Sequence, residues 1–390
     1  MDFALTGEQE ALRDTAAKYL ADGRASAGSG QAWADAVGLG WLDPELGTVE
    51  LALIAEQLGR AGSPLPWWAT VGLAGPALGA AGRPVRRPAT LAWAEPGGPD
   101  TLAAWIRAAD GGAGSVAGGG EARTGAGSAA ANGGRTAAGS AAAPAGTCPG
   151  STCVVAADGT VTGHKIRVPH LVDAADVVVA AAGAHGVELR LVDGEHLRPR
   201  PVDAGPHGLD ATRPVASVEL AAVPSVPLVA PDRAADVLAL TRRRALALLA
   251  AEGVGVAAQA LATATGHAAS RTQFGRPIGA NQAVAHPLAE VYGQVEMARS
   301  LAYRAAWSVD AESGPAADLA VVTATAAARE AATAACEAAI QTYGGSGFTW
   351  EQPLHRWYRR AWWLATFDGT VADFRAELAG LLLDGPGDTR

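Results

Sequence analysis

The chain has 390 residues, and 49% of them are hydrophobic, which is enough for two or three domains with a sizeable core. A formal net charge of −9 argues against nucleic acid or an anionic membrane surface as the main partner. Three cysteines are too few for a disulfide framework, and no group of side chains has the spacing of a metal site.

Residues 1–87 predict an N-terminal helical domain. Thr6 is the expected N-cap of the first helix, because a threonine hydroxyl accepts a free backbone N–H and acidic residues follow in the first turn. A further helix is expected over 49–58, before the glycine-containing segment 59–62. The chain starts without a basic and apolar leader, and no apolar run reaches the roughly 20 residues that cross a bilayer. We therefore expect a soluble cytoplasmic protein without a membrane span.

Residues 88–231 have the pattern of an antiparallel β domain. Short strand-like runs alternate with Gly, Pro and Asp, at 90–94, 153–156, 176–181, 187–192 and 215–220. Residues 111–147 are nearly all Gly, Ala, Ser and Thr, which bury too little apolar area to offset the entropy lost on ordering. We expect a disordered insertion there, because a phosphate-binding glycine loop would end in Lys-Ser/Thr and lead into a helix.

Residues 232–390 predict a helical bundle. Long runs without a helix breaker are interrupted at Pro315 and at the glycines of 344–347. The expected main helices cover 233–270, 283–310, 316–342 and 368–383, and a shorter one lies near 352–365. Their alanine-rich faces allow close packing, so an antiparallel four-helix bundle is expected.

The segment between the first two bundle helices carries polar and aromatic residues at the point where the chain turns. Glycines and a proline at 275–279 end the helix, so Arg271, Phe274 and Gln282 lie at a helix junction. Two further blocks follow: 341–347 reads Gln-Thr-Tyr-Gly-Gly-Ser-Gly, and 367–370 reads Phe-Asp-Gly-Thr.

These three blocks, in this order and spacing, resemble motifs of the acyl-CoA dehydrogenase family. The resemblance covers about 233–384 and extends more loosely to 1–70. It implies a mainly α fold with an N-terminal helical domain, a middle antiparallel β-barrel-like domain and a C-terminal four-helix bundle. It also implies an FAD cofactor, α,β-dehydrogenation of an acyl-CoA, an electron-transfer flavoprotein as acceptor, and a homo- or hetero-oligomer.

The resemblance assigns most of the cofactor contacts to the helix junctions. A planar arginine fork at 271 suits a pyrophosphate, an aromatic ring at 274 suits adenine, and glycine backbone N–H groups approach a ligand closely. The alternatives are a solvated arginine at the end of the helix and a glycine C-cap at 344–347. The implied FAD contacts are Arg271, Phe274, Gln282, Gln341, Gly344, Gly345, Gly369 and Thr370.

Asp368 occupies the position at which many family members have a catalytic glutamate. The resemblance makes its carboxylate the base that removes the α-proton of the acyl thioester. It also places Arg242, Arg243 and Arg244 near the substrate or base, with Arg244 as the candidate substrate residue, unless they only solvate the start of a helix. From the residues alone, Asp368 has an alternative role as a helix N-cap, for which aspartate is favoured. Glu252, on the first bundle helix, is a weaker alternative base.

The middle domain departs from the family pattern on the side that faces the flavin. The loop 94–100 retains only part of the family motif, and the slot after Lys165 reads Ile166-Arg167-Val168 where the family has a tryptophan. Two alternatives to the dehydrogenase therefore stay open. One is a non-catalytic partner subunit of a heteromeric acyl-CoA dehydrogenase, and the other is a nitroalkane-oxidase-like flavoenzyme, which uses an aspartate as base.

Overall fold

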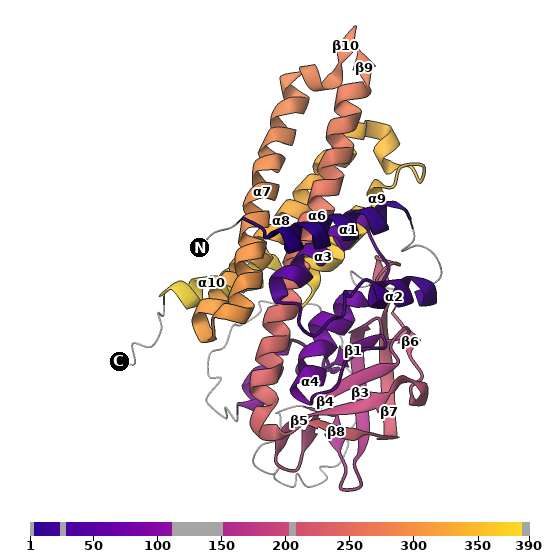
Figure 1. Cartoon of the computed structure of the whole chain (residues 1–390), viewed down its shortest axis with the longest axis vertical. Helices are drawn as coiled ribbons and strands as arrows, with labels where there is room; N and C mark the ends of the chain where they lie inside the picture. The colour runs from indigo at the N-terminus through magenta and orange to yellow at the C-terminus, as the bar shows by residue number, and fades with distance from the viewer. Residues whose placement is uncertain (1–3, 24–28, 111–150, 203–207, 384–390) are drawn as a thin grey trace, which may run out of the picture.

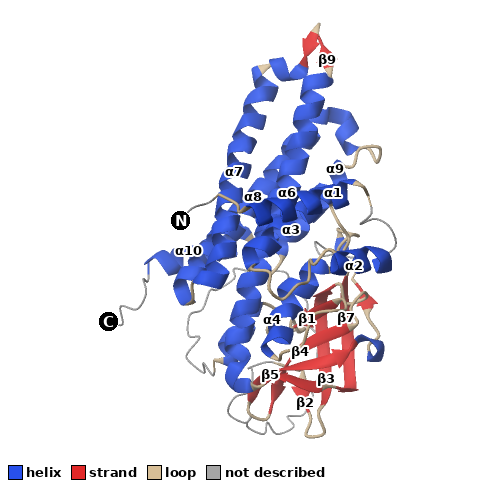
Figure 2. Ribbon diagram, in the orientation of Figure 1, coloured by secondary structure: helices blue, strands red, loops and turns tan. Residues whose placement is uncertain are grey.

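The computed structural model describes residues 4–23, 29–110, 151–202 and 208–383. A long helical bundle forms one end of the molecule and a β-sheet forms the other, with the N-terminal helices packed beside both (Figure 1). Figure 2 shows that helices make up most of the described chain and that strands gather at one end. This arrangement confirms the predicted fold class. The insertion predicted at 111–147 lies outside the described residues.

The N-terminal helices begin where the sequence indicates. The Oγ of Thr6 accepts the Gln9 N–H at 3.2 Å, and the Gln9 side chain accepts the Thr6 N–H at 3.0 Å, so the predicted N-cap is confirmed. The sequence did not predict the buried π-helix η2 or the short helix that follows it. The elements are α1 (Gly7–Ala21), α2 (Ser29–Gly38), α3 (Thr48–Ala61), η2 (Ala69–Ala74) and α4 (Gly75–Ala80).

The described part of the middle domain forms an eight-stranded sheet in the order β6-β7-β3-β2-β4-β5-β8, with β1 paired to β4. The expected antiparallel pairing is wrong in two places, because β1 and β2 both run parallel to β4. The helix α5 (Leu102–Ala109), also not predicted, follows β1. The strands are β1 (Ala89–Ala92), β2 (Val154–Val155), β3 (Thr160–Pro169), β4 (Asp176–Gly183), β5 (Gly186–Asp193), β6 (Arg200–Pro201), β7 (Val215–Pro224) and β8 (Val226–Val229).

The bundle contains the predicted helices with ends shifted by up to three residues. Its longest helix, α6, has 40 residues and is about 60 Å long. This helix is long and apolar enough to cross a membrane, so the expectation that no segment of the chain is long and apolar enough is wrong. However, 89% of its most apolar 18-residue segment is buried inside the protein. The helices are α6 (Pro231–Ser270), α7 (Gln282–Ala311), α8 (Gly314–Tyr343), α9 (Leu354–Thr366) and α10 (Val371–Leu383).

Helices α3 and α6 cross with their backbones in contact. A Cβ at Gly59 would lie 2.1 Å from the Glu252 carbonyl oxygen, and a Cβ at Gly255 would lie 2.0 Å from the Glu56 carbonyl oxygen. Only glycine permits this approach, which brings the N-terminal domain against the bundle within one hydrophobic core.

Gly255→Ala is expected to lower the free energy of unfolding by about 1–3 kcal/mol, because the added methyl must push the two helices apart. Chemical denaturation of both proteins measures this difference. Gly266→Ala, in the same helix and with open space at its Cβ, is the matched control. Because alanine favours the helix by about 1 kcal/mol, that control should be neutral or slightly stabilising, and equal effects of the two variants would contradict the tight crossing.

Candidate active site

A cavity of about 660 Å³ lies between the middle domain and the turn that joins α9 to α10. The middle domain contributes Trp93 and Arg167 to its wall, and the bundle contributes Arg242 and Glu377. Three predicted site residues, Asp368, Gly369 and Thr370, line the same cavity. Its size is in the range of ordinary ligand pockets, roughly 300–1,000 Å³.

The Asp368 side chain is fully buried at the wall of this cavity and accepts two hydrogen bonds. Oδ1 accepts the Leu102 N–H at 2.7 Å, and Oδ2 accepts the Arg242 Nε–H at 2.8 Å. Asp368 has a φ of +55°, a left-handed conformation that is rare for aspartate. Asp368 therefore does not cap α10. The Thr370 and Asp373 side chains do so by exchanging hydrogen bonds with each other's backbone.

Two arginines hold the turn around Asp368. Arg329 donates to the carbonyl oxygens on both sides of it, at 2.6 Å to Phe367 and 2.8 Å to Gly369. Arg242 binds both oxygens of Glu377, each at 2.8 Å, in addition to Asp368. Burial raises the pKa of Asp368 above its usual range, although Arg242, the Leu102 N–H and Arg329 oppose the rise. A buried carboxyl with a raised pKa beside a cavity is typical of a functional site.

Aromatic rings form the floor beneath this turn. Phe367 stacks on Trp363 at 5.4 Å between ring centroids and meets Trp68 and Trp93 edge-on at 5.0 and 5.6 Å. The indole N–H of Trp68 donates to the Ala245 carbonyl at 3.0 Å, which fixes the cluster to α6. The cavity thus has an apolar floor and a charged rim.

The three consecutive arginines of α6 point to three different places, because successive helical residues are about 100° apart. Arg242 reaches Asp368, whereas Arg243 pairs with Asp318 at 2.7 Å. Arg244, the predicted substrate residue, lines a separate cavity of about 150 Å³. Of the three arginines that the resemblance places near the substrate or base, Arg242 lies at the candidate site, whereas Arg244, the candidate substrate residue, does not.

Glu252, the alternative base, belongs to a buried ion-pair network away from the cavity. It accepts two hydrogen bonds from Arg213, at 2.6 and 2.8 Å, and pairs with Arg360. Arg360 also pairs with Asp210. Although burial opposes its charge, Arg213 and Arg360 hold the pKa of Glu252 below its usual range. Unlike Asp368, Glu252 does not line the cavity and its pKa is lowered, so the structure does not support it as the base.

The remaining predicted cofactor residues lie at the far end of the bundle, beside the hairpin of β9 (Thr272–Gln273) and β10 (Arg276–Pro277) at the tip of the molecule (Figure 1). Arg271 ends α6 and is exposed, and Phe274 is 99% exposed with a φ of +51°. Gln282 begins α7. Gln341 lies in the last turn of α8, and the exposed Gly344 and Gly345 follow its end.

The predicted contacts therefore form two groups in one chain. Gly344, with a φ of +60°, is the C-cap of α8, which confirms that reading of the glycines. His267 stacks on Tyr343 at 4.0 Å between ring centroids, so the ends of α6 and α8 lie together. Arg242 and Arg271 are 29 positions apart on the continuous helix α6, or about 44 Å.

The comparisons with known proteins agree with this geometry. Residues 237–377 match the family model of the acyl-CoA dehydrogenase C-terminal domain. Acyl-CoA dehydrogenase IpdE2 of Mycobacterium tuberculosis is 33% identical over 208 residues, which cover 53% of this chain and 58% of that protein. The human mitochondrial short-chain specific acyl-CoA dehydrogenase is 37% identical over 135 residues, which cover 35% and 32%.

Solved structures extend the similarity to the whole fold. The ChsE4–ChsE5 complex from M. tuberculosis superposes with a TM-score of 0.75 at 20% identity, over 99% of this chain and 100% of that one. Butyryl-CoA dehydrogenase from Megasphaera elsdenii superposes with a TM-score of 0.76 at 20% identity, over 98% and 100%. The bundle is therefore similar in sequence to the C-terminal domain of acyl-CoA dehydrogenases, and the whole chain has their fold. The sequence matches to these two curated relatives span 58% and 32% of their lengths.

The slot after Lys165 has Ile166 where the family motif has a tryptophan, and the next residue is Arg167. Arg167 lies at a bulge in β3 with a φ of +55°, and its guanidinium pairs with Asp100 at 3.2 Å across the cavity wall. Beneath it, Lys165 and Glu95 form a fully buried ion pair at 2.6 Å, and the Lys165 ammonium lies 4.4 Å from the Trp105 ring. The loop at 94–100 matches the family motif only in part, but its Glu95 has a defined role as the buried partner of Lys165.

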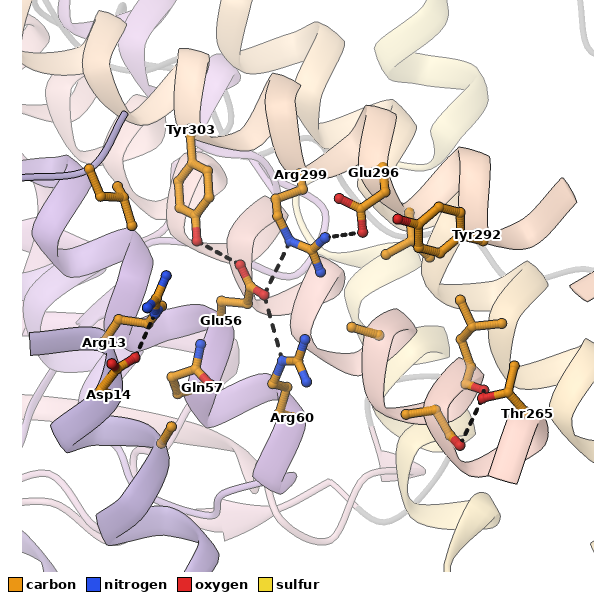
Figure 3. A pocket seen from close by; sticks show the side chains of 16 residues that line it. Arg13, Asp14, Glu56, Gln57, Arg60, Thr265, Tyr292, Glu296, Arg299 and Tyr303 are labelled. Atoms are coloured by element: carbon orange, nitrogen blue, oxygen red, sulfur yellow. Dashed lines mark hydrogen bonds and ion pairs between the residues drawn. The ribbon is translucent and has the colours of Figure 1, made fainter. Parts of the chain in front are cut away.

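A second cavity, of about 690 Å³, lies between α1, α3, α6 and α7 (Figure 3). Glu56 is at its centre, where it accepts the Tyr303 hydroxyl at 2.6 Å and the Arg299 Nε–H at 3.3 Å, and Arg60 lies 3.6 Å away. Burial, together with the charge of Glu56, raises the pKa of Tyr303, so this phenol is a neutral donor. No predicted site residue lines this cavity, and we assign the chemistry to the first one.

Proposed function

We propose that the chain is a subunit of an FAD-dependent acyl-CoA dehydrogenase that converts an acyl thioester into its α,β-unsaturated product. The observation that carries this proposal is the buried carboxylate of Asp368, which has a raised pKa and lies at the wall of a cavity large enough for a ligand. Acyl-CoA is the proposed substrate, and an electron-transfer flavoprotein is the proposed electron acceptor.

The residues at both ends of the bundle suit an FAD. At the far end, Arg271 offers a planar fork for a pyrophosphate, Phe274 offers an exposed ring, and a Cβ at Gly345 would meet nothing within 4 Å. At the cavity, Trp93, Phe367 and Thr370 offer aromatic and polar groups for the flavin ring. A bound FAD would supply the hydride acceptor, which no amino-acid side chain provides.

The chain's own residues would handle the proton. An ionised Asp368 oxygen would take the α-proton of the thioester, and the hydride would leave from the neighbouring carbon. The Leu102 N–H and Arg242 fix the position of the carboxylate, and Arg329 fixes the backbone around it. The aromatic floor excludes water from the reacting carbons.

The two groups of cofactor residues favour a site shared between two copies of the chain. About 44 Å of helix separates Arg242 from Arg271, which is much longer than a dinucleotide. The residues of the bundle end would therefore contact the FAD that lies beside Asp368 of a second copy. We propose a homo-oligomer in which each site is built by two chains.

Arg271→Ala is expected to weaken FAD binding by about tenfold to a hundredfold, because a charge-assisted pair with phosphate contributes about 1.5–3 kcal/mol. The flavin content of the purified protein and its FAD titration curve measure the loss. Arg276→Ala is the matched control, since Arg276 lies in the exposed hairpin that follows Arg271 but bonds to Asn281. Equal losses in both variants would contradict a specific role for Arg271.

A non-catalytic partner subunit is the second candidate function, and one observation favours it. Both oxygens of Asp368 are already hydrogen-bonded, and Arg242 holds one of them as an ion pair. The solved structures with this fold include two of paired proteins, ChsE4–ChsE5 and Tcur3481–Tcur3483. Co-expression with a second dehydrogenase chain separates the candidates. Activity that needs the second chain and survives Asp368→Asn would assign the base to that chain.

A further inference from the structure

The guanidinium of Arg242 is divided between two carboxylates. Its Nε donates to Asp368, while both terminal nitrogens donate to Glu377 in a fork, each at 2.8 Å. The Arg242 side chain is 10% exposed and the Asp368 side chain is fully buried, whereas the Glu377 side chain is 34% exposed on the cavity wall. Glu377 lies outside the Phe-Asp-Gly-Thr block at 367–370.

We propose that Glu377 is a positioning residue that keeps Asp368 basic by holding Arg242 away from a full ion pair with it. This inference rests on the proposed function, in which Asp368 is the base. Glu377 takes the planar fork of Arg242, so Asp368 receives only the single Nε–H bond. A fork-to-fork pair between Arg242 and Asp368 would stabilise the ionised carboxylate further and make it a weaker base.

Glu377 also removes the energetic cost of leaving Arg242 without a counter-charge after Asp368 takes up a proton. Arginine keeps its charge throughout the reaction, so a protonated Asp368 would otherwise leave a nearly buried guanidinium without a counter-charge. With Glu377 in place, the remaining Arg242–Glu377 pair is neutral and complete. Proton uptake at Asp368 then changes the charge of the three-residue group from −1 to zero, and no charge is left unpaired.

The other groups that face Asp368 come from four packed elements and do not replace Glu377. Arg329, on α8, donates to backbone carbonyls beside Asp368 and adds positive charge. Asp373, on α10, is bonded to Thr370, and the Asp100–Arg167 pair of the middle domain is internally balanced. Leu102, on α5, contributes one backbone N–H. Among the described residues, only Glu377 takes the fork of Arg242.

The test is the pH dependence of kcat and KM for Glu377→Gln. We expect the acid limb of the kcat profile to move toward lower pH by about one pH unit, because a freed Arg242 favours the ionised base. At neutral pH we expect kcat to fall about tenfold and KM to change less than about twofold. Glu377→Asp, which keeps the charge, should restore part of both changes.

Asp318→Asn is the matched control. Asp318 also accepts two hydrogen bonds from one arginine, namely from Nε and one terminal nitrogen of Arg243, the next residue of α6. Its side chain is 31% exposed, compared with 34% for Glu377. Asp318 lies outside the cavity, so the pH profile of the Asp318→Asn enzyme should match that of the wild type. An unmoved profile for Glu377→Gln, or one that moves equally for Asp318→Asn, would overturn the inference.

A second readout works without turnover. Because its folded pKa is raised, Asp368 contributes stability that is present at low pH and is lost as the pH rises through that pKa. Glu377→Gln should move this loss toward lower pH, and the movement should vanish in the Asp368→Asn background. If this shift with pH appears but the wild type has no activity, Glu377 acts on Asp368 as inferred and the proposed function is wrong. If the enzyme is active but the shift is absent, the inference about Glu377 is wrong and the proposed function stands.

Discussion

Asp368→Asn is expected to lower the rate of substrate-dependent flavin reduction by about 10³-fold, because a positioned general base contributes roughly 10²–10⁴-fold. Asparagine has nearly the same shape, and its carbonyl oxygen still accepts the Leu102 N–H, but it takes no proton. The rate of flavin bleaching after anaerobic mixing with an acyl-CoA panel measures this loss. The flavin content of the variant should stay unchanged, since asparagine keeps the shape of this side chain and the bond to Leu102, and the proposed FAD contacts are untouched.

The same substitution should not destabilise the protein at neutral pH. Burial raises the pKa of Asp368, so its ionised form opposes folding above that pKa, and asparagine removes this effect. We expect the free energy of unfolding to stay the same or rise by up to about 1–2 kcal/mol, as is common when a functional group in a strained setting is removed. A large loss of stability would identify Asp368 as a structural residue, and full activity would remove it from the mechanism.

Arg360→Ala is expected to lower the free energy of unfolding by about 3–5 kcal/mol. The Arg360 side chain is 2% exposed and pairs with Asp210 and Glu252, and it donates to the Ser63 carbonyl and the Thr212 hydroxyl at 3.1 and 2.6 Å. Its removal leaves two buried carboxylates with fewer counter-charges. Urea unfolding monitored by tryptophan fluorescence measures the change.

Arg87→Ala is the control for this prediction, because Arg87 forms a largely exposed pair with Asp176 at 2.6 Å. Such surface pairs contribute about 1 kcal/mol or less. The folded pKa of both Asp210 and Glu252 is lowered, so their pairing stabilises the protein above the usual carboxyl range and is lost as the pH falls. The deficit of Arg360→Ala relative to the wild type should therefore shrink in acid. A deficit equal to that of Arg87→Ala would contradict the network.

The bundle could be predicted from the sequence because its helices are long and its breaks are marked by glycine and proline. The junctions at 271–282 and 341–347 were located for the same reason, since a chain that must turn there brings its motif residues to the helix ends. The position of Asp368 also followed from its motif, and the structure places it in the cavity. These features depend on local sequence.

Features set by packing could not be predicted in the same way. A choice between Arg242 and Arg244 depends on the rotation of α6 against its neighbours, and the two residues differ by about 200° around the helix. The pairing of Arg360 with Glu252 joins residues 108 positions apart. The parallel pairing of β1 with β4 depends on the path of the chain between them, which strand-like runs do not reveal.

Subunit complementation tests the central claim most directly, namely that one site contains Asp368 of one chain and Arg271 of another. Co-expressed Arg271→Ala and Asp368→Asn chains should form hybrids with one doubly damaged site and one intact site. For random pairing in a dimer, we expect roughly a quarter of the wild-type activity, well above either variant alone. Hybrids verified by mass spectrometry that show no activity beyond the two parent variants would contradict the shared site.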